Sequence, residues 1–485
     1  MKFLITIFYL FNLANGIYLQ EINKSIKKFA TNPVLKNASI SFEIVAINND
    51  SVVSSYQSKQ SLVPASTMKL ITTATALEVL GHKHQFKTSL AYDGIIDSTG
   101  LLTGNIYIIG SGDPTLGSKY FPGQDFLNEC LNSINKIGIK KVDGGIIADA
   151  SCYSDEFVPS NWTWGDIGNY YGAGVTGLSI YDNTVSLFFK SGKNIGDKTI
   201  ITSTHPNIPN LEIKNEVISK NINSDQAYIF GAPYSPFRVA RGEIPLNVSE
   251  FNVKASIFDP ALLIAHELDK VLKENNVQLK NPPKSIRILK EENKSVEYDG
   301  NTFYQHLSPP LKAIINNINL ISNNHFAEHI HRSLGFQLNK NDIVSAYSSS
   351  QQIKNYWINK GLSCNGFYMS DGSGLSRNNA VSASFLVDVL CYMKINSARF
   401  SDFFESLPVA GKTGTLKYLG KGTILEGKLM AKSGSIQRVR SYAGYYKPNE
   451  KTLYAFAVIV NNYSCSGAEL KKLLEKLLIT ELEDL

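Results

Sequence analysis

Segments with the alternation of β-strands lie at both ends of this chain, and helical patterns lie between them. Near the N-terminus, residues 40–47 and 51–56 alternate apolar and polar side chains around a short polar turn, which is the signature of a β-hairpin. Near the C-terminus, residues 439–446 and 453–460 have the composition of two further strands, and a helical pattern follows over 468–481. Strands at both ends with helices between them predict an α+β domain whose sheet uses both termini.

The interior of the chain alternates between two kinds of pattern. Apolar residues recur at helical spacing in the segments 64–80, 260–272, 311–334 and 382–393. The long stretch from 88 to 253 reads instead as short strands interrupted by Gly, Asp and Pro. This stretch predicts β-rich material inserted into the α+β domain.

Composition excludes several classes of protein. The chain has 485 residues, 43% of them hydrophobic, so it is long enough for several packed domains. Its net charge is only +6, and no basic block with interleaved aromatics is present, which argues against a nucleic-acid partner. The five cysteines show no metal-ligand spacing, which excludes a zinc-finger array and a disulfide scaffold and leaves any pairing open.

The first residues have the features of a secretory signal. Lys2 precedes about 11 mostly apolar residues, and the small-residue stretch Ala14-Asn15-Gly16 follows. The apolar run is too short for a bilayer, which takes about 20 residues. We expect a signal peptide over 1–16, export of the mature protein, and no transmembrane anchor after cleavage, with an uncleaved anchor as the alternative.

The first candidate site is the tetrapeptide Ser66-Thr67-Met68-Lys69 at the start of a helical pattern. Pro64 bars an earlier start, and Gly81 is suited to the end of the helix. Residues three apart share a helix face, so the Lys69 amine is expected one turn from the Ser66 hydroxyl. Taken alone, the motif fits a helix-capping serine beside a solvated lysine equally well.

Two more polar motifs occur later in the chain. Ser322-Asn323-Asn324 falls at a break in a helical run, where a hydroxyl for proton relay and an amide for a substrate carbonyl can face one cleft. Turn formation is the plainer interpretation of such residues. Lys432-Ser433-Gly434-Ser435 precedes the C-terminal strand pair; there a lysine and hydroxyls can bind a carboxylate, and the glycine admits a close backbone.

In this order the three motifs resemble the S-x-x-K, S-x-N and K-[TS]-G set of penicillin-binding proteins and serine β-lactamases. A large insertion between the first two motifs is similar to the class C low-molecular-mass penicillin-binding proteins, the D-alanyl-D-alanine carboxypeptidase/endopeptidase family. The resemblance extends from about residue 25 to the C-terminus. Further matching stretches are Gly112–Leu116, Tyr171–Ala173, Asp182-Asn183, Ser308–Leu311 and Asp371–Arg377.

The resemblance implies a fold and a division of the chain. The fold is a β-lactamase/transpeptidase-like domain, an antiparallel sheet flanked by helices, with two inserted β-rich modules. The implied parts are a catalytic domain over 17–87 and 297–485, an inserted domain II over 88–183 and 254–296, and an inserted domain III over 184–253.

The resemblance also implies residue roles. Ser66 would be the acylated nucleophile, Lys69 its general base, and Ser322 the residue that carries a proton toward the leaving amine. Asn324 would hold the acyl-side amide, and the backbone N–H groups of Ser66 and Ser435 would form the oxyanion hole. The residues implied to bind the terminal carboxylate are Lys432, Ser433, Gly434 and Ser435.

The expected protein is an exported, periplasmic bacterial serine D,D-peptidase. It would remove the terminal D-Ala from peptidoglycan stem peptides, cut D,D cross-links as a second activity, use no cofactor or metal, and be acylated by β-lactam antibiotics. A β-lactamase is disfavoured by the insertion and by the lack of a recognisable deacylating Glu. The alternative from another class is an inactive peptidoglycan-binding protein.

Two further patterns compete with these assignments. His325-Phe-Ala-Glu328-His329 matches the H-x-x-E-H pattern of zinc peptidases, but no third ligand is recognisable. Lys412-Thr413-Gly414 has the commoner spelling of the third motif, but nearby Gly and Pro residues favour a loop. We therefore expect Lys432 to bind substrate and Lys412 to be a solvated loop residue. The Asp113 and Asp371 loops are expected to be turns, because Asp-Pro and Asp-Gly are turn dipeptides.

Overall fold

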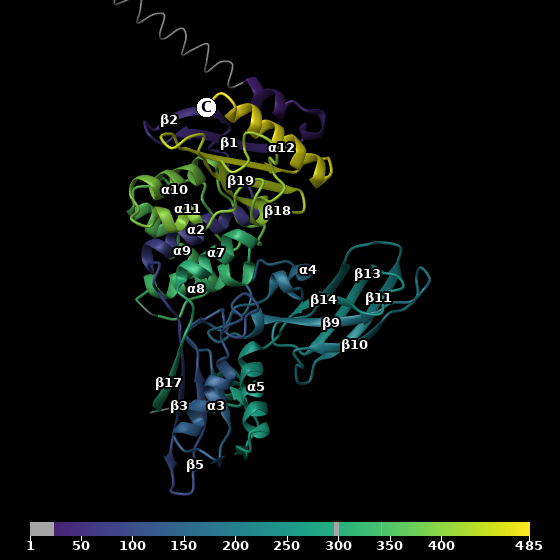
Figure 1. Cartoon of the computed structure of the whole chain (residues 1–485), viewed down its shortest axis with the longest axis vertical. Helices are drawn as coiled ribbons and strands as arrows, with labels where there is room; N and C mark the ends of the chain where they lie inside the picture. The colour runs from purple at the N-terminus through teal and green to yellow at the C-terminus, as the bar shows by residue number, and fades with distance from the viewer. Residues whose placement is uncertain (1–23, 295–299, 341) are drawn as a thin grey trace, which may run out of the picture. The chain divides into compact units, whose positions relative to one another are not determined.

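The computed structural model describes residues 24–294, 300–340 and 342–485 (Figure 1). The predicted signal peptide at 1–16 therefore lies outside the described residues. Contacts divide the chain into two compact units. Unit 1 comprises the described residues up to His82 together with Lys312–Asn323 and Ser350–Leu485, and unit 2 comprises Lys83–Leu311 and Asn324–Ser349.

Unit 1 is built on one antiparallel sheet of five strands in the order β18-β19-β20-β1-β2. Strand β1 from the N-terminal hairpin pairs along its whole length with β20 from the C-terminal segment, with Phe42 opposite Val458. The predicted α+β domain with a sheet that uses both termini is thus confirmed. The strands are β1 (Ser39–Ala46), β2 (Ser51–Tyr56), β18 (Leu429–Ile436), β19 (Val439–Tyr446) and β20 (Tyr454–Asn461).

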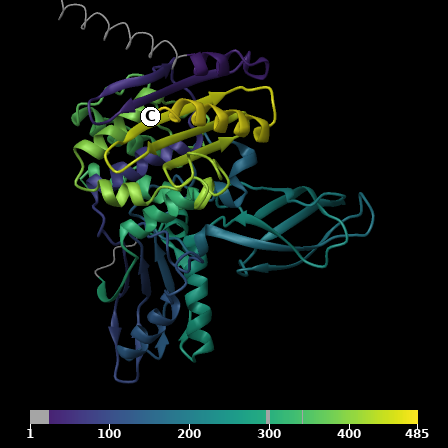
Figure 2. The same ribbon diagram turned by 45° about the horizontal axis from the view of Figure 1, so that its top comes forward.

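Helices cover both faces of this sheet (Figures 1 and 2). The C-terminal helix α12 (Gly467–Leu482) packs Leu470 and Leu474 onto Phe42 and Val458 in one apolar core. Helix α10 (Ala383–Ile395) contacts β1, β19 and β20 and also α2. Further helices are α2 (Met68–Val79), α7 (Leu311–Ile321), α9 (Ala346–Asn359) and α11 (Phe400–Glu405), and the described residues 24–30 are also helical.

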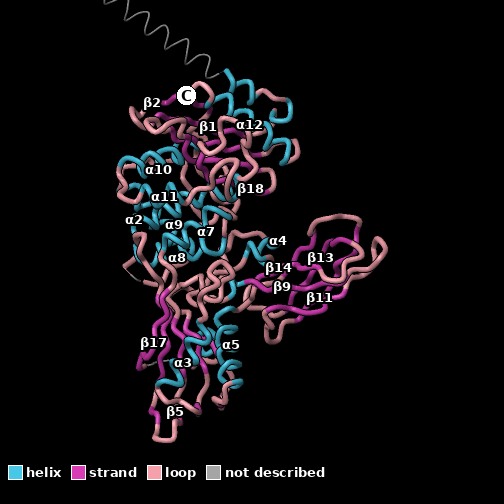
Figure 3. The backbone as a smooth tube through the Cα atoms, viewed as in Figure 1, coloured by secondary structure: helices cyan, strands magenta, loops and turns pink. Residues whose placement is uncertain are grey.

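Unit 2 contains the inserted strands and has four small sheets (Figure 3). Their strand orders are β16-β8-β6-β3-β17, β15-β7-β5-β4, β10-β9-β14 and β11-β13-β12. The strands are β3 (Lys87–Tyr92), β4 (Ile95–Ile96), β5 (Leu101–Thr103), β6 (Ile106–Ile109), β7 (Lys141–Val142), β8 (Ile146–Asp149), β9 (Thr184–Lys190), β10 (Ile200–His205), β11 (Glu212–Lys220), β12 (Gln226–Phe230), β13 (Phe237–Pro245), β14 (Phe251–Ser256), β15 (Gln278–Leu279), β16 (Lys284–Ser285) and β17 (Asn301–Leu307).

The helices of unit 2 are α3 (Phe126–Lys136), α4 (Trp164–Ile167), α5 (Pro260–Glu274), α6 (Ile286–Glu291) and α8 (Asn324–Leu338). Helices α3 and α5 pack against each other, and α5 also packs on β8. Helix α3 begins with an Asp125 cap, so the prediction of strands alone between residues 88 and 253 is wrong for this segment.

Strand β17 pairs with β3 and so belongs to unit 2. The predicted division into a catalytic domain over 17–87 and 297–485 and an inserted domain II over 88–183 and 254–296 stays a prediction. The separation of 184–253 as a module of its own stays a prediction. Across the described residues, no helix combines the length and the apolarity needed to cross a bilayer.

Candidate active site

Ser66 and Lys69 lie where the N-terminal hairpin passes into helix α2. Ser66 is in a short 3₁₀ turn, Ala65–Thr67, and Lys69 is in the first turn of α2. The Lys69 Nζ donates to Ser66 Oγ at 3.0 Å, so the helical spacing brings the two groups together as expected. Lys69 is fully buried, which rules out the alternative of a capping serine beside a solvated lysine.

Lys69 is held by a second contact from a distant loop. Its Nζ donates to the Ser373 carbonyl oxygen at 2.6 Å. That carbonyl belongs to a turn that Asp371 stabilises by accepting the backbone N–H groups of Gly374 and Ser376, as the Asp-Gly dipeptide predicted. Gly374 has φ +81°, and a Cβ there would lie 1.9 Å from the Ala65 carbonyl oxygen. Only glycine therefore allows the loop to approach the serine turn this closely.

Lys432 forms the other cationic group of the site. It lies on β18, at one end of the strand order, and is fully buried. Its Nζ donates to Ser322 Oγ at 2.9 Å and to the Ser433 carbonyl oxygen at 2.8 Å. Burial, with the neighbouring charge of Lys69 as a second cause, holds the pKa of Lys432 well below its usual value. The two lysines thus share one buried and electrostatically coupled site.

Gly434 lets β18 lie directly against the serine turn. A Cβ at this position would lie 2.6 Å from the Pro64 carbonyl oxygen and 3.0 Å from the Ser66 backbone nitrogen. Ser441 on the adjacent strand β19 donates to the same Pro64 carbonyl at 2.5 Å. The glycine of the third motif is therefore a steric requirement of the site, as its sequence context suggested.

The flanking hydroxyls of the third motif differ in their surroundings. Ser433 is half-buried and donates to Thr415 Oγ1 at 2.8 Å, whereas Ser435 is exposed. Thr415 was not singled out from the sequence, although it stands directly after the competing Lys412-Thr-Gly motif. Lys412 itself is exposed in a turn.

The second motif is divided by the unit boundary. Ser322 directly follows α7 with a left-handed φ of 63°, which marks the predicted break in the helical run. Asn324 is the first residue of α8 in unit 2, where its Nδ2 donates to the Tyr171 carbonyl oxygen at 2.8 Å. The role of Asn324 stays a prediction.

The H-x-x-E-H segment has a structural explanation. His329 Nδ1 lies 2.9 Å from the Gly112 carbonyl oxygen and its Nε2 lies 3.1 Å from Ser179 Oγ, so both ring nitrogens have partners. Over the described ranges, no group of three His, Cys, Asp or Glu side chains is placed to hold a metal ion. The five cysteines, all of them described, form no disulfide with one another.

Known proteins match nearly the whole chain. The model of the D-Ala-D-Ala carboxypeptidase 3 (S13) family matches residues 22–479. The D-alanyl-D-alanine carboxypeptidase of Actinomadura sp. is 27% identical over 465 residues, which cover 93% of this chain and 83% of that protein. The D-alanyl-D-alanine carboxypeptidase DacB of Haemophilus influenzae is 24% identical over 478 residues, which cover 94% of each chain.

Solved structures establish the fold. The crystal structure of penicillin-binding protein 4 (dacB) from Haemophilus influenzae has a TM-score of 0.80 at 22% identity and covers 96% of this chain and 99% of its own. The structure of that protein in complex with a β-lactam has a TM-score of 0.76 at 22% identity, over 96% of this chain and 98% of its own. The predicted fold class, including its likeness to the transpeptidase-like proteins, is confirmed.

Proposed function

The chain belongs to the D-Ala-D-Ala carboxypeptidase 3 (S13) family, and on this premise we propose that it is a serine D,D-peptidase that acts on peptidoglycan stem peptides. The observation that carries this proposal is the 3.0 Å contact between Lys69 Nζ and Ser66 Oγ in a buried site that holds a second lysine, Lys432. A serine hydroxyl needs an adjacent base to become a nucleophile, and Lys69 is the group in place for it.

The reaction begins with attack by Ser66 Oγ on the carbonyl carbon of the penultimate D-Ala, while the Ser66 proton passes to Lys69 Nζ. Lys69 must be neutral to accept it. The two lysines repel each other in a buried site, and this repulsion favours loss of a proton from the pair. The C–N bond then breaks and the terminal D-Ala leaves as an amine, which takes up the proton that Lys69 accepted. Ser322, whose hydroxyl accepts a hydrogen bond from Lys432, would relay this proton to the leaving amine. Water releases the shortened peptide from Ser66.

The remaining roles concern substrate binding. Lys432, Ser433 and Ser435 would bind the terminal carboxylate of the substrate, and Asn324 the amide on its acyl side. The backbone N–H groups of Ser66 and Ser435 would stabilise the oxyanion, a contribution worth about 3–4 kcal/mol per donor in a well-studied serine hydrolase. Gly434 supports this assignment, because it brings β18 to the Ser66 nitrogen.

Three finer parts of the proposal rest on the same site and on the sequence. Cleavage of D,D cross-links uses the same acyl transfer with a longer leaving amine. β-Lactam antibiotics would acylate Ser66 as substrate analogues, and the complex of the Haemophilus influenzae relative with a β-lactam supports this. Export to the periplasm is inferred from the features of residues 1–16.

Labelling with a fluorescent penicillin tests the proposal. We expect covalent label on the Ser66 peptide, full loss of label in Ser66→Ala, and normal label in Ser401→Ala, which changes an exposed serine of α11. Mass analysis of products from intact cell-wall fragments should then show release of D-Ala. Absence of labelling together with retained binding to cell-wall fragments would support the alternative of an inactive peptidoglycan-binding protein.

A further inference from the structure

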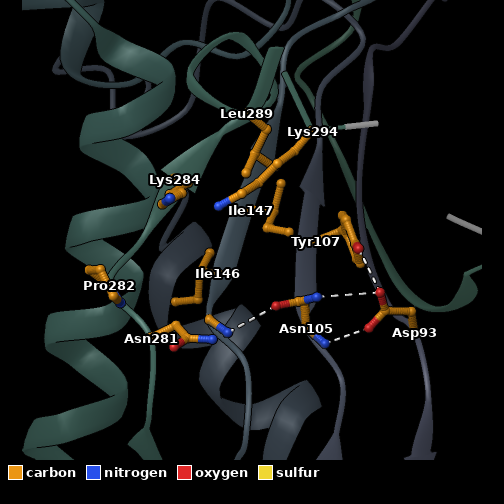
Figure 4. Close-up of a pocket in the computed structure, with 11 residues that line it drawn as sticks. Asp93, Asn105, Tyr107, Ile146, Ile147, Asn281, Pro282, Lys284, Leu289 and Lys294 are labelled. Carbon is orange, nitrogen blue, oxygen red and sulfur yellow. Dashed lines mark hydrogen bonds between the residues drawn. The ribbon is translucent and has the colours of Figure 1, made fainter. Parts of the chain in front are cut away.

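Unit 2 has a cavity on one face of its five-stranded sheet, formed by its own residues. The opposite face of this sheet carries the main apolar core under α3 and α5. Among the described residues, the face with the cavity carries the small apolar cluster Ala91, Tyr107, Ile147 and Leu289, under the short helix α6. A helix of six residues is about 9 Å long and cannot cover a sheet of five strands, which is about 19 Å wide. Beside α6, the residues that the structure describes leave a cavity of about 480 Å³ (Figure 4).

One end of the cavity carries a fixed carboxylate. Asp93, which follows β3, accepts the Asn105 backbone N–H at 2.5 Å and the Tyr107 hydroxyl at 2.6 Å. Asn105 is fixed in turn, because its Oδ1 accepts the Gly145 N–H at 3.1 Å. These contacts hold Asp93 in one orientation beside the cavity (Figure 4), so a ligand would meet a prearranged hydrogen-bond acceptor.

The other end is cationic. Lys284 on β16 and Lys294 after α6 both line the cavity (Figure 4), and both donate to the single carboxylate of Glu292, at 2.6 Å and 2.8 Å. Two ammonium groups around one carboxylate leave a net positive charge. The side chain of Lys294 is 60% exposed, so it has room to bind an incoming anion.

Aliphatic side chains lie between the two ends. Ile147 from β8 and Leu289 from α6 contribute apolar surface to the cavity, and Pro282 lies at its exposed rim. A cavity of this size that combines aliphatic groups with fixed polar groups in comparable measure can hold a small polar molecule or a peptide. Its two ends select for a ligand that carries both a carboxylate and an amino group.

We propose that this cavity is a second, non-catalytic binding site for a peptidoglycan stem peptide, whose carboxylate contacts Lys284 and Lys294 and whose amino group contacts Asp93. The choice of a stem peptide as the occupant rests on the proposed function, since such peptides carry free carboxylates and amines. The dipolar character of the ligand rests on the cavity itself. Saccharide binding without a peptide is the competing possibility, because Asp and Asn side chains also bind sugar hydroxyls.

Calorimetric titration with the tetrapeptide L-Ala-γ-D-Glu-L-Lys-D-Ala tests this site, because that peptide lacks the bond to be cleaved. The protein is the full chain with Ser66→Ala, titrated alone and with cavity substitutions. We expect the double substitution Lys284→Gln with Lys294→Gln to weaken one binding event at least about tenfold, and Asp93→Asn to weaken the same event. The matched controls are Lys280→Gln and Asp143→Asn, an exposed ion pair of unit 2 outside the cavity, which should change nothing.

Chemical modification of the ligand assigns each end. A tetrapeptide amidated at both carboxylates should bind the unsubstituted cavity at least about tenfold more weakly than the free tetrapeptide does. In the double lysine variant the two peptides should bind equally, because the groups that contact the carboxylate are gone. A tetrapeptide with acetylated amines should bind the unsubstituted cavity more weakly than the free tetrapeptide does. Its affinity should be the same for Asp93→Asn as for the unsubstituted cavity. Placed on the chain with Ser66 intact, the cavity substitutions should leave penicillin acylation unchanged, which verifies that the catalytic site is intact. An unchanged circular dichroism spectrum and urea midpoint verify that unit 2 of the variants folds.

The proposal is overturned if the tetrapeptide binds all cavity variants as it binds the parent protein. It is equally overturned if the peptide-free disaccharide GlcNAc-MurNAc, and not the tetrapeptide, shows the dependence on Lys284, Lys294 and Asp93. Failure of the proposed function is a different result, namely a chain with Ser66 that no penicillin acylates. The titration does not depend on that outcome, since Ser66 is already replaced in it.

Discussion

Lys432 Nζ donates to Ser322 Oγ at 2.9 Å, which joins strand β18 to the residue that ends helix α7. The contact satisfies one donor of an ammonium group that is fully buried and whose pKa burial lowers strongly. A second cation, Lys69, lies close enough to lower that pKa further. The Ser66 hydroxyl accepts a hydrogen bond from Lys69, and the Ser322 hydroxyl accepts one from Lys432. Each serine of the proposed proton path therefore contacts an amine that can exchange a proton with it.

Replacement of Lys69 by Arg tests the base. Arginine keeps the positive charge but does not lose its proton at accessible pH, so it cannot accept the proton of Ser66. We expect a folded protein whose acylation by penicillin is slower by about 10²–10⁴-fold, the usual cost of losing a general base. The second-order acylation rate measures this, with the exposed Lys412→Arg as the control. A near-normal rate in Lys69→Arg would contradict the assignment.

Two lysines of similar sequence context should behave differently when replaced by alanine. Lys432→Ala removes a charge-assisted contact of about 1.5–3 kcal/mol to the substrate carboxylate and leaves Ser322 without its donor, so acylation should fall at least tenfold. Lys412→Ala changes an exposed turn residue and should stay within a few-fold of wild type. The same acylation assay decides between them. The reverse ranking would show that Lys412-Thr-Gly is the true third motif.

Gly434→Ala should damage the site without unfolding the protein. The added methyl group would lie 2.6 Å from the Pro64 carbonyl oxygen and 3.0 Å from the Ser66 nitrogen, so β18 or the serine turn has to shift. A displacement of about 1 Å at reacting groups costs about 10²-fold in rate, which is the loss of acylation that we expect. Gly467→Ala is the control, since its methyl group meets no heavy atom closer than 3.6 Å. Equal acylation rates for the two variants would refute the close packing of β18 on Ser66.

Helix α8 buries an imidazole whose protonation should destabilise the fold at low pH. Burial lowers the pKa of His329 to about 4, against about 6.5 in an unfolded chain. Between these values the unfolded state binds more protons, so the stability contributed by neutral His329 is present above about pH 6.5 and is lost as pH falls toward 4, by up to about 3 kcal/mol.

Urea unfolding at pH 7 and pH 4.5 measures this effect. The difference in unfolding free energy between wild type and His329→Gln should shrink at the lower pH, because the wild type has one buried imidazole more than the variant, which keeps the buried His325 and His331. The exposed His205→Gln should show no such change. A pH-independent difference for His329→Gln would mean that the imidazole is not held neutral in the fold.

Local sequence determined the elements that carry the site. The alternation in 40–56 predicted the hairpin β1–β2, and the residues from Pro64 to Gly81 predicted a helix with Lys69 one turn from Ser66. The polar break at Ser322 predicted the interruption between α7 and α8. Each of these features depends on neighbours within a few residues, because helix spacing, strand alternation and turn chemistry are local properties of the chain.

Tertiary structure alone decided what surrounds those elements. No local pattern indicates that the Ser373 carbonyl holds Lys69, that Lys432 is buried beside that lysine, or that strand β17 pairs with β3 in the second unit. The same holds for the cavity that Asp93 and Lys294 line, since β3, β6, β8, β16 and α6 come together to form its described walls. These arrangements join residues that are far apart in the chain. They depend on how whole elements pack, because burial and electrostatic coupling arise only when those surfaces meet.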